Sequence, residues 1–417
     1  MPSVDGQLFP SQTTTKLDND DNTKDHNQST EESFPILSWK QCLVDRSQFV
    51  DNLSRALSTT GFFYLTDIAV PDQHHDVANM TFQSNEQLEQ GRQTWQSIWD
   101  NSFSVSEQFF HLEEQDKLEI EMIHSKCFRG YSKFGSETTA GKQDQREQID
   151  FGPESTTTTM TGPDDTSEDI WFNLYGPNQF PRQVPSFRDT INEFRRTCDF
   201  ISRRLVESIG QSVSKDPSAL LKPFTTDVKY PAYSRMKVVR YPPVSLEVAK
   251  DQGLLGVGAH RDGGGLTLLA MDGTPGLQVQ LWNGEWRTVQ PRKYDLVINI
   301  GQVIERLTHG VYTATTHRVL ATTGSKPRIS IPFFYSPSLA SHVTPIPVET
   351  LLPHAKQLVD KGGRKVVSEI RKGDLHEEMF GRAAWRGITR SHDSVWKKYY
   401  GQYDKVGGPD KFLSTSN

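Results

Sequence analysis

The clearest periodic pattern in the chain is a run of apolar side chains spaced three and four residues apart across residues 187–213. This spacing predicts one long helix with a single buried stripe. The stripe consists of Phe187, Ile191, Phe194, Cys198, Ile201, Leu205 and Ile209. Further helices are predicted at 45–60, ending near Gly61, at 80–120 and at 347–400.

Beyond about residue 230 the pattern changes to short apolar runs separated by turns. Short runs at regular spacing predict the strands of an all-β sandwich or barrel. The predicted strands are Met236–Tyr241, Leu266–Ala270, Leu277–Trp282, Leu296–Ile300, His317–Ala321 and Arg328–Tyr335, with an earlier one at Phe62–Leu65. The polar, glycine-punctuated region 126–185 is expected to be rich in loops.

The first 32 residues differ in composition from the rest of the chain. They hold seven acidic residues and two lysines, so they carry −5 of the net charge of −6. With almost nothing to bury, they predict a disordered acidic tail. The nearly neutral remainder has no basic surface that would attract nucleic acid or anionic lipid.

These patterns divide the chain into five predicted parts. They are a tail at 1–32, an N-terminal region of helices and strands with a loop-rich end at 33–185, a support helix and linker at 186–229, a β core at 230–340, and a C-terminal helical region at 341–417.

Nothing in the sequence indicates export or a membrane span. No stretch approaches about 20 consecutive apolar residues, and the first residues lack the pattern of a signal peptide. The final residues, STSN, are not a peroxisomal signal. Three cysteines without a CxxC pair fit a reducing compartment. We therefore expect a cytoplasmic protein.

Candidate chemistry begins in the stretch AHRDGGGLTLL, residues 259–269. His260 and Asp262 are two residues apart, so in a strand they point the same way and can hold one metal ion. Such a pair is a weak signal by itself. A third candidate ligand, His317, follows 55 residues after Asp262. Two histidines and one carboxylate form the facial triad of non-haem Fe(II) oxygenases, which leaves other metal positions open.

Two further residues suggest what would occupy those positions. Arg328 and Ser330 also share one face of a predicted strand. A keto acid that binds the metal and carries a distal carboxylate needs a fixed cation and a hydroxyl, and arginine binds carboxylate with two parallel hydrogen bonds. Gly263–Gly265 would form a turn with little bulk beside the metal, or only a surface turn.

In number, order and spacing these motifs resemble the isopenicillin N synthase-like branch of the iron and 2-oxoglutarate-dependent oxygenases. The similarity is close over about residues 230–340 and looser over 34–185. The matching residues are Arg240-Tyr241-Pro242-Pro243, AHRDGGGLTLL, Gly276-Leu277-Gln278-Val279, Trp286, Val289-Gln290-Pro291, Asn299-Ile300-Gly301, Leu307-Thr308, His317-Arg318-Val319 and Arg328 to Phe334, with Phe34-Pro35-Ile36 and Gly61-Phe62-Phe63 in the N-terminal part.

The resemblance implies a mainly β fold with flanking helices, built on a double-stranded β-helix (jelly-roll) core. It implies Fe(II) bound by His260, Asp262 and His317. It assigns the carboxylate of 2-oxoglutarate to Arg328 and Ser330, with Tyr241 helping to hold the co-substrate or substrate. O2 is the other co-substrate, and ascorbate is a candidate reductant.

The expected enzyme is a monomeric 2-oxoglutarate-dependent dioxygenase. It would hydroxylate, desaturate or cyclise a small molecule of secondary metabolism through a ferryl intermediate, without a nucleic-acid or membrane partner. Three alternatives stay open: an oxidase that does not use 2-oxoglutarate, because isopenicillin N synthase keeps the Arg-x-Ser pair; an ethylene-forming enzyme; and a non-catalytic jelly-roll binding protein, which an intact triad disfavours.

The sequence also departs from the family pattern. Arg261 stands where the family usually has threonine or another uncharged or acidic residue, His309-Gly310 replaces Asn-Gly, and the segment Pro243–Leu255 is longer than usual. These departures weaken any transfer of substrate identity.

Several other residues have less certain roles. His309 is expected to be a core residue rather than a ligand, because three ligands complete the triad. Phe334 would line the pocket or simply pack. Four residues of the loop-rich region could touch substrate, although a structural or solvated role is favoured: Arg129, Tyr131, Glu147 and Gln148.

Overall fold

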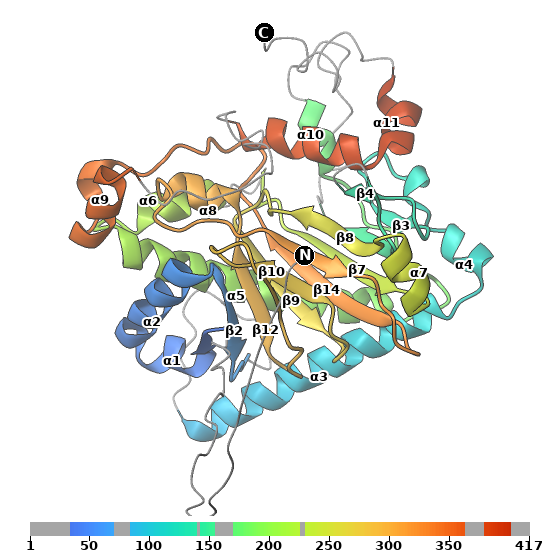
Figure 1. Cartoon of the computed structure of the whole chain (residues 1–417), viewed down its shortest axis with the longest axis horizontal. Coiled ribbons are helices and arrows are strands. Elements are labelled where there is room, and N and C mark those ends of the chain that lie inside the picture. Colours follow the sequence, from blue (N-terminus) through green and yellow to red (C-terminus); the bar gives the residue numbers. More distant parts are fainter. Residues whose placement is uncertain are drawn as a thin grey trace, which may run out of the picture. The chain divides into compact units, whose positions relative to one another are not determined.

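The computed structural model describes residues 34–70, 84–139, 142–154, 170–225, 230–362 and 379–401. The predicted tail lies outside these residues. The main body contains two large β-sheets with helices around them (Figure 1). In the described residues no helix combines the length and the apolar character that crossing a membrane requires.

The larger sheet has eight strands. In spatial order they are β1 Ile36–Ser38, β2 Phe62–Thr66, β12 Leu296–Ile300, β9 Leu266–Met271, β14 Arg328–Tyr335, β7 Arg235–Tyr241, β6 Glu147–Phe151 and β3 Gly130–Ser132. The smaller sheet has four: β11 Trp286–Thr288, β10 Leu277–Gln280, β13 His317–Leu320 and β8 Leu255–His260. Two short strands, β4 Thr138–Thr139 and β5 Lys142–Gln143, form a separate hairpin.

The two large sheets share an apolar interior. Val239 and Met271 from the larger sheet belong to the same buried cluster as Leu277, Val279 and Val319 from the smaller one. Side chains alternate between the faces of a strand, so every second residue of β7, β9 and β14 points into this interior. Any site built on inward residues of these strands therefore lies between the sheets.

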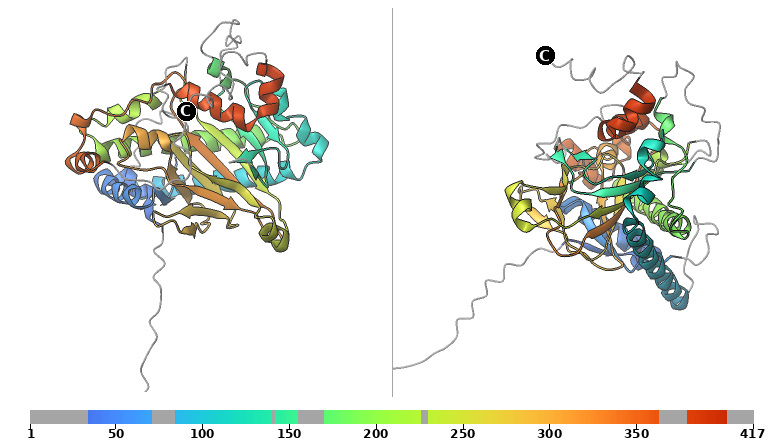
Figure 2. Two further views of the ribbon diagram at one scale, coloured as in Figure 1. Left: turned by 45° about the horizontal axis from the view of Figure 1, so that its top comes forward. Right: turned by 90° about the vertical axis from the view of Figure 1, so that its right-hand side faces the viewer.

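The opposite, outer face of the larger sheet is covered by two long helices, α3 Asn85–Phe110 and α5 Phe187–Val213, which lie against each other (Figure 2). Ile331 and Phe333 of β14 pack with Phe194 and Ile201 of α5 in the large outer core. This packing fixes the face of β14 that is left for the interior.

The described residues also form nine shorter α-helices. They are α1 Trp39–Val44, α2 Arg46–Thr59, α4 Glu114–Leu118, α6 Ser218–Leu221, α7 Leu246–Asp251, α8 Gln302–Leu307, α9 Pro353–Asp360, α10 Phe380–Ser391 and α11 Asp393–Tyr400. The helix at 45–60 is confirmed, and it begins where the Asp45 side chain accepts a hydrogen bond from the Gln48 amide.

The predicted helix 187–213 is confirmed, and all seven residues of its stripe are buried. The six predicted strands after residue 230 are also present, although β10 ends at Gln280 rather than Trp282. Region 126–185, predicted to be loop-rich, contributes β3 and β6 to the larger sheet. Strands β8 and β11 were missed, because glycine and polar residues interrupt their apolar pattern. The division into five parts stays a prediction.

The stripe of α5 makes a direct prediction about stability. Phe194 is fully buried, so Phe194→Ala should lower the free energy of unfolding by about 3–5 kcal/mol through lost burial and the cavity left behind. Arg196→Ala, at an exposed position of the same helix, is the matched control and should change stability little. Denaturant titration of both variants measures the difference. Equal stabilities would contradict the assigned packing of the stripe.

Candidate metal and co-substrate site

The three predicted metal ligands come together at one end of the interior. His260 ends β8, His317 begins β13, and the two residues are paired across these antiparallel strands. The Nε2 atoms of His260 and His317 lie 3.6 Å and 3.7 Å from Asp262 Oδ1. One ligand atom from each residue can be chosen so that all lie within 4.8 Å of one another. This is the compact set of donors that a single metal ion requires.

Backbone contacts orient both imidazole rings. The Nδ1 atom of His260 lies 2.9 Å from the carbonyl of Gly258, and that of His317 lies 3.0 Å from the carbonyl of Thr315. Each carbonyl can only accept, so each Nδ1 carries the hydrogen in the neutral ring. The lone pairs of both Nε2 atoms are then directed toward Asp262. Orientation through the second ring nitrogen is typical of histidine metal ligands.

Asp262 is held as an anion by its neighbours. Its Oδ2 accepts hydrogen bonds from Thr267 Oγ1 at 2.6 Å and Asn299 Nδ2 at 2.8 Å. Burial alone would raise the pKa of Asp262, but His317 and His260 and the Thr267 hydroxyl lower it by more, so the pKa lies below its ordinary value. The other oxygen, Oδ1, is the one that faces the histidines.

His317 is suited to be a neutral ligand. Burial, with a smaller contribution from His260, lowers its pKa to about 4, so the ring is uncharged at neutral pH. Phe62 packs edge-on against this ring, with 5.4 Å between ring centroids. Two imidazole nitrogens and one carboxylate in this arrangement match the donor set of non-haem Fe(II).

The proposed co-substrate residues lie further along the same interior. Arg328 and Ser330 are inward residues of β14, paired with Tyr241 and Val239 of β7. Arg328 Nη1 is 3.4 Å from Ser330 Oγ, and the guanidinium carbon lies 4.8 Å from the centroid of the Tyr241 ring. The three predicted side chains therefore form one group.

Arg328 lacks a charge partner in the part of the chain that the structure describes. It is 1% exposed, its Nε has no hydrogen-bond partner, and no carboxylate of the described residues is recorded within ion-pair distance. A buried cation without a counter-ion is strongly unfavourable. The group therefore fits an anionic ligand, and the distal carboxylate of 2-oxoglutarate has the right charge and shape.

Arg261, which departs from the family pattern, braces the metal ligands. Its Nε donates to the carbonyl of Ala314 at 2.9 Å, and its Nη2 pairs with Glu305 Oε2. The same Glu305 oxygen accepts the Ala314 amide at 2.7 Å. The side chain thus ties the loop carrying His260 and Asp262 to α8 and to the segment three residues before His317.

The glycine run after Asp262 is closely packed at two of its three positions. A Cβ on Gly264 would lie 2.5 Å from Ser336 Oγ, and one on Gly265 would lie 2.5 Å from the Phe224 ring. The carbonyls of Asp262, Gly264 and Gly265 accept the amides of Gln302, Val303 and Gly301 at the start of α8. The small size of Gly264 and Gly265 therefore serves close packing against Ser336 and Phe224, whereas a Cβ on Gly263 would meet nothing within 4 Å. The role of the run beside the metal stays a prediction.

Most of the less certain residues prove structural. Arg129 is buried and donates to the carbonyl of Leu174 at 2.7 Å. Tyr131 donates to Glu147, which also pairs with Lys117 and Arg240 on the outward side of β6. His309 contacts the carbonyl of Ile346 at 2.7 Å and takes a φ of 53° at the end of α8. Phe334 falls on the same face of β14 as Arg328, and Gln148 falls on the inward face of β6.

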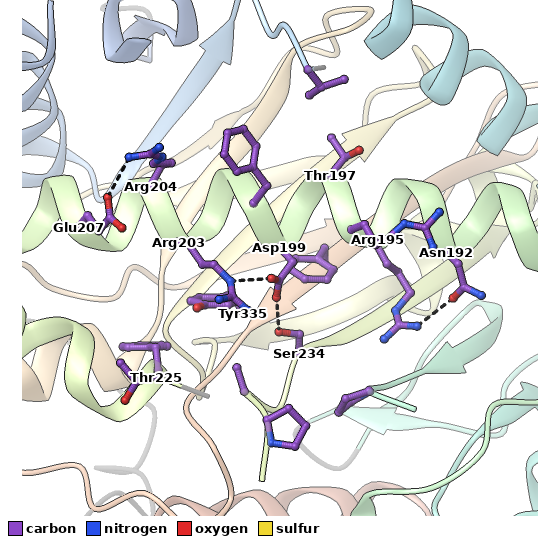
Figure 3. Close-up of a pocket in the computed structure, with 18 of the residues that line it drawn as sticks. Asn192, Arg195, Thr197, Asp199, Arg203, Arg204, Glu207, Thr225, Ser234 and Tyr335 are labelled. Carbon is purple, nitrogen blue, oxygen red and sulfur yellow. Dashed lines mark hydrogen bonds and ion pairs between the residues drawn. The ribbon is translucent and has the colours of Figure 1, made fainter. Parts of the chain in front are cut away.

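A cavity of about 880 Å³ lies elsewhere, along α5 (Figure 3). It is lined by Asp199 and Arg203 of α5 and by Phe333 and Tyr335 of β14. Those β14 residues point to the outer face, opposite to Arg328 and Ser330. The cavity is therefore separated by the sheet from the candidate metal ligands.

Sequence comparisons identify the family. The model of the 2OG-Fe(II) oxygenase superfamily matches residues 233–337, and that of the non-haem dioxygenase in morphine synthesis N-terminal region matches 34–183. A 2-oxoglutarate-dependent dioxygenase of Gibberella zeae is 30% identical over 88% of this chain and 91% of its own length. The chain belongs to the 2OG-Fe(II) oxygenase superfamily.

Other relatives agree with this membership. A homoarginine-6-hydroxylase of Arabidopsis thaliana is 27% identical over 78% of this chain and 77% of its own length. A full-length Neurospora crassa protein, solved in complex with alpha-KG, has a TM-score of 0.57 at 24% identity, covering 75% of this chain and 88% of that one. At this identity the likeness concerns the fold, and the predicted jelly roll is confirmed.

Membership confirms the predicted enzyme class and cofactors. The chain is a 2-oxoglutarate-dependent dioxygenase, an oxidoreductase that uses Fe(II), 2-oxoglutarate and O2. Membership favours this interpretation over an oxidase that does not use 2-oxoglutarate, an ethylene-forming enzyme or a non-catalytic jelly roll.

The brace formed by Arg261 can be tested through iron affinity. Arg261→Met removes both anchors of the ligand loop, so the Fe(II) dissociation constant should rise about tenfold, as for other residues that orient metal ligands. Arg318→Met is the matched control, because Arg318 follows His317 as Arg261 follows His260 but lies over Trp286. Anaerobic Fe(II) titration of both variants measures the effect. Unchanged iron affinity in Arg261→Met would show that the brace is dispensable.

Proposed function

We propose that this dioxygenase oxidises a small molecule of secondary metabolism, with His260, Asp262 and His317 holding Fe(II), and Arg328 and Ser330 binding 2-oxoglutarate. The buried guanidinium of Arg328, which has no counter-ion among the described residues, is the observation that carries this assignment. The close set of His260, Asp262 and His317 supports the metal half of it.

Each side chain has a defined task in this proposal. When bound, iron and 2-oxoglutarate together reduce O2, release CO2 and succinate, and supply the oxidising equivalent for a substrate C–H bond. With the metal bound, His260 and His317 would present unprotonated Nε2 atoms, and Asp262 would stay anionic while Thr267 and Asn299 hold its other oxygen. The protein would then supply three ligands, which leaves positions for a bidentate keto acid and O2.

Arg328, Ser330 and Tyr241 would fix the co-substrate at its far end. The guanidinium offers two donors to one carboxylate, and the Ser330 hydroxyl adds a third. The Tyr241 ring against Arg328 limits the rotamers of the arginine and shields it from water. Such preorganisation would hold the co-substrate in one orientation, with its keto end free to reach the metal.

The nature of the partners is part of the same proposal. The homoarginine-6-hydroxylase relative acts, by its name, on a small molecule, which supports a small-molecule substrate here. The body of the chain is nearly neutral in net charge, which does not favour nucleic acid as a partner. We place the catalytic core at residues 230–340 and expect a monomer.

Replacing Arg328 tests the co-substrate site. Arg328→Met keeps the length of the side chain but removes the charge and the donors, so the KM for 2-oxoglutarate should rise by about tenfold to a thousandfold. Iron affinity should stay within about twofold, because Arg328 is not a metal ligand. Arg328→Lys keeps the charge without the paired donors, so its KM for 2-oxoglutarate should lie between those of the natural protein and Arg328→Met. Steady-state succinate assays supply the KM values, and an unchanged KM in Arg328→Met rules out the assigned clamp.

Replacing His317 tests the metal site. His317→Ala leaves two ligands, so Fe(II) binding and 2-oxoglutarate turnover should both be lost. His309→Ala is the matched control, because this histidine lies eight residues earlier and contacts only a backbone carbonyl among the contacts recorded for it. It should keep iron stoichiometry near that of the natural protein. Iron content after anaerobic reconstitution separates the two variants, and normal iron content in His317→Ala would refute the triad.

A further inference from the structure

A second group of charged side chains lies inside the body, next to the candidate triad. Ligand atoms of Glu137, Asp150 and His392 lie within 4.8 Å of one another. Three cations surround them: Arg146, Arg235 and Lys237. We call these six residues the inner ionic cluster. The proposed function does not use it.

Strand register places Asp150, Arg235 and Lys237, the members of the inner ionic cluster that lie in strands, on the same face of the larger sheet as Thr267 and Asn299. Thr267 and Asn299, which hold Asp262, are paired, and Thr267 lies opposite Phe334, which lies opposite Arg235. Lys237 is two residues after Arg235 on β7 and points to the same face. The register of β7 and β14 puts it opposite Pro332, which pairs with Leu269 of β9. Neighbouring strands are about 4.8 Å apart, so Lys237 lies about 10 Å across the sheet from Leu269. Pro332 of β14 lies between them on the same face.

Two further connections bring the inner ionic cluster to the triad. Asp144, which pairs with Arg146, accepts a hydrogen bond from the Gly258 amide at 3.4 Å, and the Gly258 carbonyl contacts the His260 ring. His392, at the junction of α10 and α11, lies 3.5 Å from Glu137. The C-terminal helices therefore cover this side of the interior.

The acidic members of the cluster are already well satisfied. Glu137 is 2.7 Å from Arg146 and also contacts Gln148 and His392. Asp150 is 2.7 Å from Arg235 and also contacts Gln148. Asp144 pairs with Arg146 at 2.8 Å. Short, charge-assisted contacts of this kind leave the carboxylates little capacity for a further cation.

Lys237 and Arg235, by contrast, have donors to spare. The side chain of Lys237 is only 11% exposed, yet its ion pairs are long. Its Nζ lies 3.3 Å from Asp150 and 3.4 Å from Glu137. Arg235 Nε is buried without a partner. Burial lowers the pKa of Lys237 even beside two carboxylates, which means that its charge is incompletely stabilised. An incoming carboxylate would supply the close partner that Lys237 lacks and would accept from the free Nε of Arg235.

One acceptor is free as well. Gln148 is 1% exposed, and its Oε1 has no hydrogen-bond partner although its Nε2 donates to both Glu137 and Asp150. With Asp144 the cluster has three acids and three cations, and burial lowers the pKa of His392 so that it stays neutral. A ligand with a carboxylate, a neighbouring donor and no net charge leaves this balance unchanged.

We propose that Lys237 and Arg235 bind the carboxylate of a zwitterionic substrate whose ammonium reaches Gln148, so that the enzyme oxidises a free amino acid. The inference rests on the proposed function, because it takes the interior face beside the triad as the substrate chamber. An apolar substrate would cover these charges without pairing them, at a large desolvation cost. A second metal ion would add positive charge to carboxylates that are already paired.

The test uses the full-length protein loaded anaerobically with Fe(II) and 2-oxoglutarate. The probes are a panel of free protein and non-protein α-amino acids, each beside its primary amide, with binding calorimetry and succinate release after O2 is admitted as readouts. At least one amino acid should bind and stimulate succinate release, and its amide should have a KM at least about tenfold higher because the carboxylate is gone.

Variants then locate the contact. Lys237→Met should raise the KM for the stimulating amino acid by about tenfold or more, while the KM for 2-oxoglutarate and the iron content stay as in the natural protein. Lys237→Arg should restore most of the loss. Lys250→Met, at an exposed position of α7, is the matched control. If Lys237→Met does not fold, the comparison of acid and amide still decides, because it needs no variant.

Three outcomes overturn the inference. They are an absence of binding by every amino acid of the panel, equal stimulation by acid and amide, and a second equivalent of Fe(II) that binds the natural protein and is lost in His392→Ala. Failure of the proposed function looks different. In that case the natural protein releases no succinate from 2-oxoglutarate even slowly and without substrate, and Arg328→Met has no effect on 2-oxoglutarate binding.

Discussion

A charge buried between two β-sheets needs a partner of opposite charge or hydrogen bonds that replace water. The buried charged residues of this protein differ in how completely they have such partners. Asp262 is paired by two donors on one oxygen and faces two imidazoles with the other. The inner ionic cluster is paired within itself, apart from spare donors on Lys237 and Arg235. Arg328 has no counter-ion among the described residues. Because an unpaired buried charge is costly, the degree of pairing separates residues that complete the structure from residues that require a ligand.

Strands β7 and β14 bring these charged residues into the interior, because their side chains alternate between the two faces of the sheet. The inward face of β7 presents Tyr241, Val239, Lys237 and Arg235, and the inward face of β14 presents Arg328, Ser330 and Phe334. The outward residues of β14, such as Ile331 and Phe333, are part of the core that packs on α5. A slip of one residue would place the guanidinium of Arg328 against that apolar helix. The packing of α5 therefore secures the register on which the site depends.

The sequence was most informative where one physical signal dominated. The stripe of α5 follows a period of 3.6 with one apolar face, and the structure has the helix at the same residues. The pair at Arg328 and Ser330 follows the period of two of strand β14, so their common orientation could be predicted. The pair at His260 and Asp262 was predicted on the same period, but β8 ends at His260 and Asp262 follows in the adjoining loop, so only the structure shows that the two side chains meet. Contacts between residues far apart in the sequence could not be predicted in this way. The hydrogen bonds of Thr267 and Asn299 to Asp262 join residues that only the pairing of β9 with β12 brings together.

The inner ionic cluster shows why the rest escaped prediction and how part of it could have been found. Glu137 and Arg146 come from a region that looks like a loop. His392 comes from the junction of α10 and α11, near the other end of the chain, so no local pattern connects the three residues. Lys237 is different, because it is two and four residues from Val239 and Tyr241 on a predicted strand. A lysine on the same face as a predicted co-substrate residue must either be buried with partners or meet a ligand. The period that identified Arg328 and Ser330 therefore already marked Lys237 as a residue of the interior, and only the loose geometry of its ion pairs separates a structural lysine from one that is available to a substrate.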